Sequence, residues 1–242
     1  MKSKKQHIIN RLRKHIATIE SHTRYNSGRT LRFGVPAIDT TLGGGLALGG
    51  VHDMTAATTG AADAFTALIT GRIAEQANAP VLWLERGHSL YAPGLVAFGL
   101  PPERLILVSG IARDRDLLWA AEEALQSPAL AAVVAEVRVA ALTAVRRLQL
   151  AAETSGVTAF LLRDSHNDGA GTLTRWRIAA APSHPNDAGE PGLGHPAWTV
   201  ELVRCRHGRP GTWTLGWRDG CLHLLADGRR EDATLPRRRA TG

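Results

Sequence analysis

Short apolar segments alternate with segments of helical periodicity through the middle of the chain, and this alternation constrains the fold most. The apolar segments predict strands over Gly49–Thr55, Pro80–Leu84, Leu105–Ser109, Ala131–Glu136 and Val157–Leu162. The intervening segments predict helices over Asp63–Gln76, Ala92–Phe98, Asp114–Gln126 and Ala140–Thr154, with Asp114 as a helix cap. Continuously apolar strands separated by helices are typical of a parallel sheet covered on both faces, so the predicted fold class is α/β.

After Gly171 the pattern changes to that of antiparallel strands. Strands are predicted over Leu173–Ala181, Trp198–Arg206, Thr212–Arg218 and Cys221–Leu225, with a hairpin turn at Asp219 and Gly220. We expect these strands to extend the α/β sheet as antiparallel β-hairpins. Alternation with period two predicts that Trp198, Trp213 and Trp217 belong to the core.

The N-terminal segment predicts a separate amphipathic arm. From Lys4 to Glu20 the helical spacing puts four aliphatic residues on one face, with basic and polar residues opposite: Ile8, Leu12, Ile16 and Ile19. The predicted organisation is an arm over residues 1–20, a polar linker over 21–30, a core over 31–226 and a basic, disordered tail over 227–242. The apolar face of the arm is a candidate binding site for a partner.

Basic residues concentrate at both ends of a chain whose formal net charge is +7. Such ends attract nucleic acid or acidic protein surfaces, although solvated ends that only maintain solubility have the same composition. The candidate nucleic-acid contacts are Lys4, Lys5, Arg11, Arg13, Lys14, Arg237, Arg238 and Arg239.

Composition excludes several other classes of protein. No apolar run has the length of a membrane helix, and no signal-peptide pattern is present, so we expect a cytoplasmic protein. Cys205 and Cys221 form neither a disulfide framework nor a zinc motif, and we interpret them as strand residues. The histidines lack metal-ligand spacing, so no metal site is predicted.

Several segments resemble the RecA recombinase family in order and spacing. FGVPAIDTTLGGGLAL (33–48) resembles the entry to the RecA core, WLERGHSLYAPGLVAFGL (83–100) its second strand and helix, and LAAVVAEV (130–137) its second phosphate-site strand. The similarity covers residues 31–226 and implies a RecA-like core. TRWRIAAAPS (174–183) and HPAWTVELVRCRHGRPGTW (195–213) are most similar to the ImuA proteins, small RecA relatives that also resemble the division inhibitor SulA.

The phosphate-binding loop of that superfamily is degenerate in this sequence. A P-loop needs G-x-x-x-x-G-K-[ST] after a strand, so that backbone amides and a lysine hold the phosphates and a hydroxyl binds magnesium. In the matching window the chain carries Ala56, Gly60, Ala61, Ala62 and Asp63. Ala62 replaces the lysine, and Asp63 replaces the hydroxyl and is a candidate N-cap of the next helix. We therefore predict no nucleotide cofactor.

Further positions support the same interpretation. The resemblance implies a catalytic Glu immediately before a His after the second strand, but here Gly87 precedes His88, and Glu85 is a candidate displaced substitute. Glu136 keeps a carboxylate where the family has a metal-side Asp, and we interpret it as a sheet-edge acid paired with a nearby base such as Arg138. The loops that hold single-stranded DNA in recombinases are short here.

The resemblance to ImuA implies a non-catalytic adaptor in damage-induced (SOS) mutagenesis and translesion DNA synthesis. The expected partner is the Y-family polymerase-like protein of the mutagenesis cassette, with an error-prone replicative-type polymerase and RecA as further candidates for the same assembly. We expect DNA contact to be weak or indirect, and self-association stays open. The alternatives are a SulA-like inhibitor of cell division and a divergent RecA-like ATP-binding protein.

Overall fold

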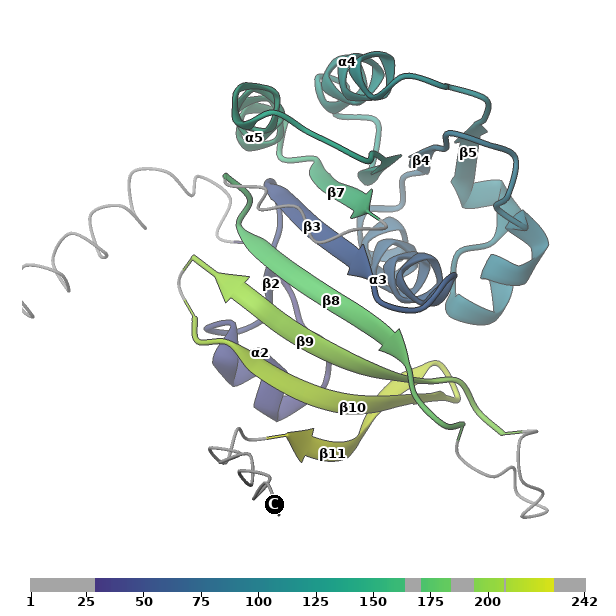
Figure 1. Ribbon diagram of the computed structural model, residues 1–242, viewed down its shortest axis with the longest axis vertical. Helices are drawn as coiled ribbons and strands as arrows, with labels where there is room; N and C mark the ends of the chain where they lie inside the picture. The colour runs from purple at the N-terminus through teal and green to yellow at the C-terminus, as the bar shows by residue number, and fades with distance from the viewer. Residues whose placement is uncertain (1–28, 164–170, 184–193, 207, 229–242) are drawn as a thin grey trace, which may run out of the picture.

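The computed structural model describes residues 29–163, 171–183, 194–206 and 208–228. Nine strands form one sheet in the order β11-β10-β9-β8-β3-β7-β6-β4-β5 (Figure 1). The strands from β8 to β5 pair in parallel: β8 (Thr174–Ala180), β3 (Val51–Ala56), β7 (Thr158–Arg163), β6 (Ala132–Glu136), β4 (Val81–Leu84) and β5 (Leu105–Val108). This mostly parallel sheet confirms the predicted α/β class.

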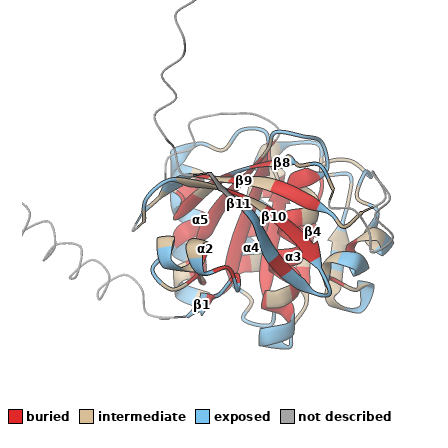
Figure 2. Ribbon diagram, turned by 90° about the horizontal axis from the view of Figure 1, so that it is seen from below, coloured by how far each residue is buried: buried red, intermediate tan, exposed pale blue. Residues whose placement is uncertain are grey.

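Helices cover both faces of the parallel part, and the strands alternate between two cores. On one side lie α3 (Ala61–Ala77) and the short α2 (Pro36–Thr41), which bury Phe65 and Ile38 in the larger cluster. On the other side lie α4 (Asp114–Leu125) and α5 (Leu142–Ser155), whose cluster includes Leu117 and Val145. The central strands between these layers are almost entirely buried (Figure 2).

The antiparallel extension consists of β8, β9 (Ala197–Cys205), β10 (Gly211–Arg218) and β11 (Cys221–Gly228). Trp198, Trp213 and Trp217 are buried, which confirms the core role predicted from period-two alternation. Asp219 and Gly220 both have positive φ, at 52° and 73°, as a tight hairpin turn requires. Cys205 and Cys221 lie in β9 and β11, as predicted.

The entry to the core contains elements that periodicity did not predict. The two-residue strands β1 (Thr30–Leu31) and β2 (Leu46–Ala47) form a small antiparallel sheet, so the predicted linker ends before Thr30. Between them, the Asp39 carboxylate accepts hydrogen bonds from the backbone N–H groups of Phe33 (2.7 Å) and Gly34 (3.1 Å). Asp39 therefore fixes the turn that leads into α2.

Two predicted helices differ from the structure. The segment Ala92–Phe98 is the 3₁₀ helix η1, because Pro93 and Gly94 disfavour a regular α-helix; a second, η2, spans Pro102–Arg104. In α4, the predicted cap Asp114 lies in the first turn, Arg113 is the N-cap residue, and no side chain caps the helix.

Candidate functional site

The loop after β3 keeps the strand–turn–helix arrangement of a phosphate-binding loop. β3 ends at Ala56, and α3 begins at Ala61 after Gly60, which has φ 75°. The positive φ lies at Gly60, so Ala61 is an ordinary helical residue rather than a strained one. The prediction that Asp63 caps the helix is wrong, because α3 begins two residues earlier and Asp63 lies within its first turn.

A cavity of about 270 Å³ opens at this loop, at the carboxyl ends of the parallel strands. In open α/β sheets, ligands bind at this edge. On the side formed by α3, the cavity is lined by Ala62 and Asp63, which the resemblance to RecA aligns with the lysine and hydroxyl of a P-loop. Its other charged residues are Glu136, Arg86, Arg138 and Arg163. Since two of these arginines already have carboxylate partners, as described below, the cavity differs chemically from a phosphate site.

Glu136 is held by β4 and the loop that follows it. Its Oε1 accepts a hydrogen bond from Nε1 of Trp83 and its Oε2 one from the backbone N–H of Arg86, each at 3.3 Å. Burial raises the pKa of this carboxyl above its ordinary range. The predicted pairing with Arg138 is wrong, because the Glu136 oxygens turn towards β4, whereas the Arg138 backbone bonds to α4.

Glu85 is almost fully buried and binds the loop after β4. Its Oε1 accepts from the Ser109 hydroxyl at 2.5 Å, and its Oε2 accepts from the backbone N–H groups of Ser89 (3.1 Å) and Leu90 (3.0 Å). Glu85 does not line the cavity. Its carboxylate is thus engaged in hydrogen bonds that hold the loop containing Gly87 and His88. These bonds support a structural role for Glu85 over that of a displaced catalytic base.

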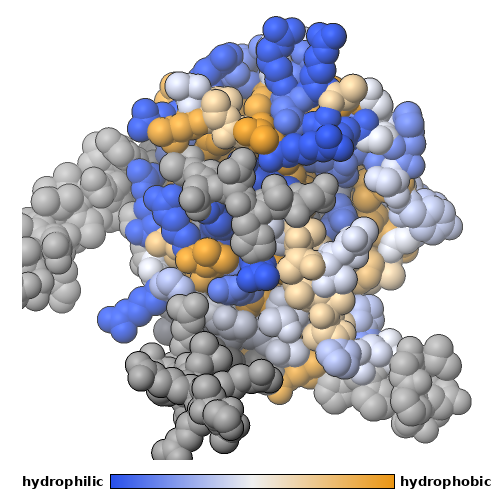
Figure 3. Space-filling model, in the orientation of Figure 1, coloured by the Kyte–Doolittle hydropathy of each residue, from blue (hydrophilic) through white to orange (hydrophobic). Residues whose placement is uncertain are grey.

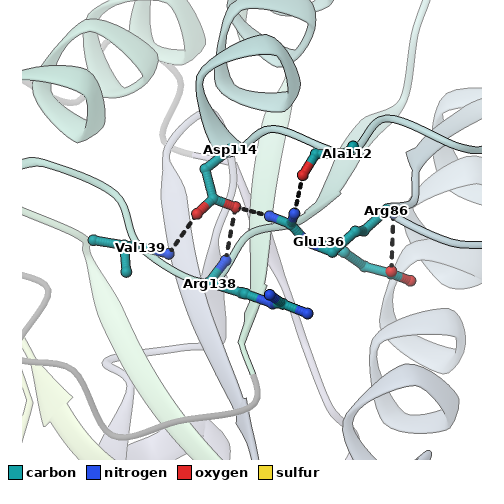
Figure 4. A network of polar contacts seen from close by, with 6 residues as sticks. All are labelled: Arg86, Ala112, Asp114, Glu136, Arg138 and Val139. Atoms are coloured by element: carbon teal, nitrogen blue, oxygen red, sulfur yellow. Dashed lines mark hydrogen bonds and ion pairs between the residues drawn. The ribbon is translucent and has the colours of Figure 1, made fainter.

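Asp114 joins three segments next to Arg86 and Arg138, two residues that line the cavity (Figure 4). It forms an ion pair with Arg86, which also donates to the carbonyl oxygen of Ala112. The same carboxylate accepts from the backbone N–H groups of Arg138 (3.0 Å) and Val139 (3.1 Å). Asp114 therefore connects the start of α4, the loop after β4 and the loop between β6 and α5. No local sequence pattern indicates this connection, since its members are far apart in the chain.

A buried ion cluster lies under the cavity, on the sheet face that α5 partly covers. Asp53 of β3 lies between Arg163 of β7 and Arg175 of β8, with Nε–carboxylate distances of 3.1 and 3.4 Å. The side chains of Asp53 and Arg163 are each only 1% exposed. Burial raises the pKa of Asp53, whereas both guanidiniums act to lower it. Sequence reasoning missed this cluster, although an aspartate inside the apolar strand VHDMTA was a signal that it needs a buried partner.

The remaining predicted site residues lie outside the described residues. These are the arm residues Ile8, Leu12, Ile16 and Ile19, and the basic residues Lys4, Lys5, Arg11, Arg13, Lys14, Arg237, Arg238 and Arg239. Within the described ranges, no group of three or more His, Cys, Asp or Glu side chains is placed to hold a metal ion. Nor does any helix in that part of the chain combine the length and apolarity required to cross a membrane.

Fold and site define an α/β protein with a strand–turn–helix loop, in which Gly60 precedes α3, Ala62 and Asp63 lie in its first turn, and a cavity opens at the carboxyl ends of the parallel strands. No protein-family model matches the chain. The protein ImuA of Caulobacter vibrioides, found in two strains, is 44% identical over 204 residues, covering 76% of this chain and 82% of the relative. The chain belongs to the ImuA family.

Proposed function

We propose that this protein is a non-catalytic, RecA-like adaptor in damage-induced mutagenesis and translesion DNA synthesis. Membership of the ImuA family supports that setting. The observation that carries the non-catalytic part is the chemistry of the cavity, where Ala62 and Asp63 line the side formed by α3. A carboxylate at this position repels phosphate, and a methyl group cannot neutralise its charge.

Two of the three arginines that line the cavity already have carboxylate partners within the protein. Arg86 forms an ion pair with Asp114, and Arg163 forms one with Asp53. The other charged groups at the cavity are Arg138 and two carboxylates, Asp63 and Glu136, which disfavour an added anion when ionised. These carboxylates and the two arginines that already have carboxylate partners count against nucleotide binding.

Titration of the purified protein with Mg-ATP in a calorimeter is expected to give no saturable binding in the micromolar range. As a control, the Ala62→Lys, Asp63→Thr variant restores the lysine and hydroxyl but is expected not to hydrolyse ATP, since Gly87 still leaves water without its base. Saturable micromolar binding by the unchanged protein would favour the alternative of a divergent ATP-binding protein.

An adaptor acts through its surfaces, and the arm offers the partner site in this proposal. Its apolar face would bind the Y-family polymerase-like protein of the mutagenesis cassette. The error-prone replicative-type polymerase and RecA would join the same assembly. Burial of apolar area is hardly screened by salt, whereas contacts between basic ends and DNA are sequence-independent and salt-sensitive. The two kinds of contact therefore separate by ionic strength.

The complex with this partner is expected to survive about 0.5 M salt, where screening removes exposed charge contacts. DNA binding by the isolated protein should be weak and vanish at that concentration. The Leu12→Asp, Ile16→Asp variant should lose the complex while its core stays folded. Val96→Asp, at an exposed apolar residue of η1, is the matched control. Equal co-purification of both variants with the partner would contradict the assignment of the arm.

Experiments in cells distinguish the proposed adaptor from the SulA-like inhibitor. Deletion of the gene should reduce damage-induced mutation and survival with normal growth otherwise, and overexpression should not cause filamentation. Filamentous cells would favour the inhibitor, and unchanged damage-induced mutation in the deletion strain would reject the adaptor.

A further inference from the structure

The α4–α5 groove, which we define as the surface between these two helices, exposes apolar side chains. Trp119 on α4 is 61% exposed and Leu150 on α5 is 66% exposed, among the largest values for apolar side chains in the described ranges. Figure 3 shows apolar patches among charged side chains at the end of the molecule where α4 and α5 lie. Exposed tryptophan beside arginine is typical of residues that dominate binding at interfaces.

Two hollows give this groove its shape. One, of about 440 Å³, is lined by Trp119 and Ala144, and the other, of about 620 Å³, by Leu150 and Thr154. Between them, Arg147 and Glu122 form an ion pair with an N–O distance of 2.6 Å, and both residues line both hollows. Each hollow thus combines polar residues with apolar ones, Trp119 in the first and Leu150 in the second, on either side of a polar bridge. This arrangement fits an amphipathic helix with aliphatic residues spaced along one face.

The N-terminal arm leaves the described part of the chain next to this groove. The carbonyl oxygen of Arg29 accepts a hydrogen bond from the backbone N–H of Leu48 at 2.9 Å. The next residue, Gly49, lies against Gly156 at the end of α5, where an added Cβ would be 3.4 Å from the Gly156 Cα. Residues 21–28 can span up to about 27 Å when extended, more than the roughly 21 Å length of α5.

Length also matches the arm to the groove. A helix over residues 4–20 would be about 25 Å long, similar to α5. The charged residues that line the two hollows are balanced, with Asp116 and Glu122 against Arg115 and Arg147. The groove therefore presents no net positive charge to residues 1–19, which contain six lysine and arginine residues and no acidic one. The arm thus has the length and apolar spacing that the groove requires.

We propose that residues 4–20 dock in the α4–α5 groove of the same chain, with the face formed by Ile8, Leu12, Ile16 and Ile19 covering Trp119 and Leu150. This goes beyond the adaptor function, because it gives the arm a closed position from which a partner has to release it. It rests on the arm assignment but not on the identity of the partner.

Cross-linking in the isolated, full-length protein tests the docking. In a Cys205→Ser, Cys221→Ser background, His15→Cys flanks the apolar face of the predicted arm helix, and Thr154→Cys lines the groove beside the end of α5. A short bismaleimide applied to dilute protein is expected to join the two cysteines within one chain, as mass spectrometry of the linked peptides will show. The matched control, His15→Cys with Val96→Cys, puts the second cysteine on η1, which packs on α3 at the opposite face of the sheet.

A double substitution in the α4–α5 groove completes the test. Trp119→Glu with Leu150→Glu is expected to lower the intrachain yield about tenfold, since the aliphatic face of the arm loses its apolar partner. Both side chains are largely exposed, so the fold should persist. Links between two chains would assign the groove to a second copy and overturn the proposal, as would a yield no higher than the control or an unchanged yield in the double variant. Because no partner is present, failure here leaves the adaptor function to its own tests.

Discussion

Replacement of Asp53 by asparagine is expected to lower the free energy of unfolding by about 3–5 kcal/mol, the usual cost of leaving a buried charge without its partner. Asp53 lies between two guanidiniums in the interior of the sheet, and the side chain of Arg163 is only 1% exposed. Without the carboxylate, Arg163 keeps its buried charge but loses its counter-ion. The free energy of unfolding in urea, with two-state behaviour checked by two probes, measures the loss.

Asp116→Asn is the control for Asp53. Asp116 lies 3.5 Å from Arg115 in an exposed pair, with 46% of its side chain accessible. An exposed pair of this kind contributes at most about 1 kcal/mol, so this variant should unfold almost as the unchanged protein does. If Asp53→Asn were equally mild, Arg163 would have another source of compensation, and the ion cluster would not stabilise the sheet as described.

Lowering the pH from about 6.5 to about 4 is expected to remove about 3 kcal/mol of stability through His52 alone. Burial lowers the pKa of His52 to about 4 from the ordinary 6.5. Its ring stacks near Phe160 and lies between the Thr174 hydroxyl (2.7 Å) and the Ala47 carbonyl oxygen (2.9 Å). Because a carbonyl oxygen only accepts, Nε2–H donates to Ala47, and Nδ1 of the neutral ring accepts from the Thr174 hydroxyl, which itself accepts from the Trp176 indole at 2.7 Å.

The direction of this pH dependence follows from proton uptake at His52. Between pH 6.5 and 4 the unfolded chain binds a proton at His52 that the folded protein excludes, so stability is complete above about 6.5 and falls as the pH approaches 4. His52→Gln cannot titrate and should flatten this part of the pH–stability curve, although its absolute stability is lower. His223→Gln, at an exposed residue of β11, should keep the slope. An unchanged slope in His52→Gln would mean that other groups cause the acid sensitivity.

The elements that could be predicted from the sequence are those whose apolar residues recur with a regular period. In uninterrupted apolar strands and amphipathic helices, the local sequence shows which residues are buried. The parallel core and the hairpins around Trp198 and Trp213 were therefore predictable. The two-residue strands β1 and β2 have no period, and they form because Asp39 fixes the turn at Phe33 and Gly34. Such elements depend on contacts that the local pattern does not encode.

In the candidate site, too, some features could be predicted from the sequence and others could not. The absence of a P-loop lysine was visible in the sequence, because Ala62 and Asp63 occupy defined positions of a motif. The partner of Glu136 was not visible, since the choice between Arg138 and the Trp83 indole depends on which way the side chain turns after the strand ends. The cluster around Asp53 joins three strands, and only the sheet order brings those strands together.

The Asp114 contacts have a mechanical consequence. Helices α4 and α5 are fastened at two points, one at Asp114, which holds the backbone of Arg138 and Val139 before α5, and one at the pair of Glu122 and Arg147. Arg138 also lines the cavity, so the outer helices and the edge where ligands would bind share one rigid frame. A tilt of α4 against the sheet is therefore expected to displace Arg138 and with it the wall of the cavity.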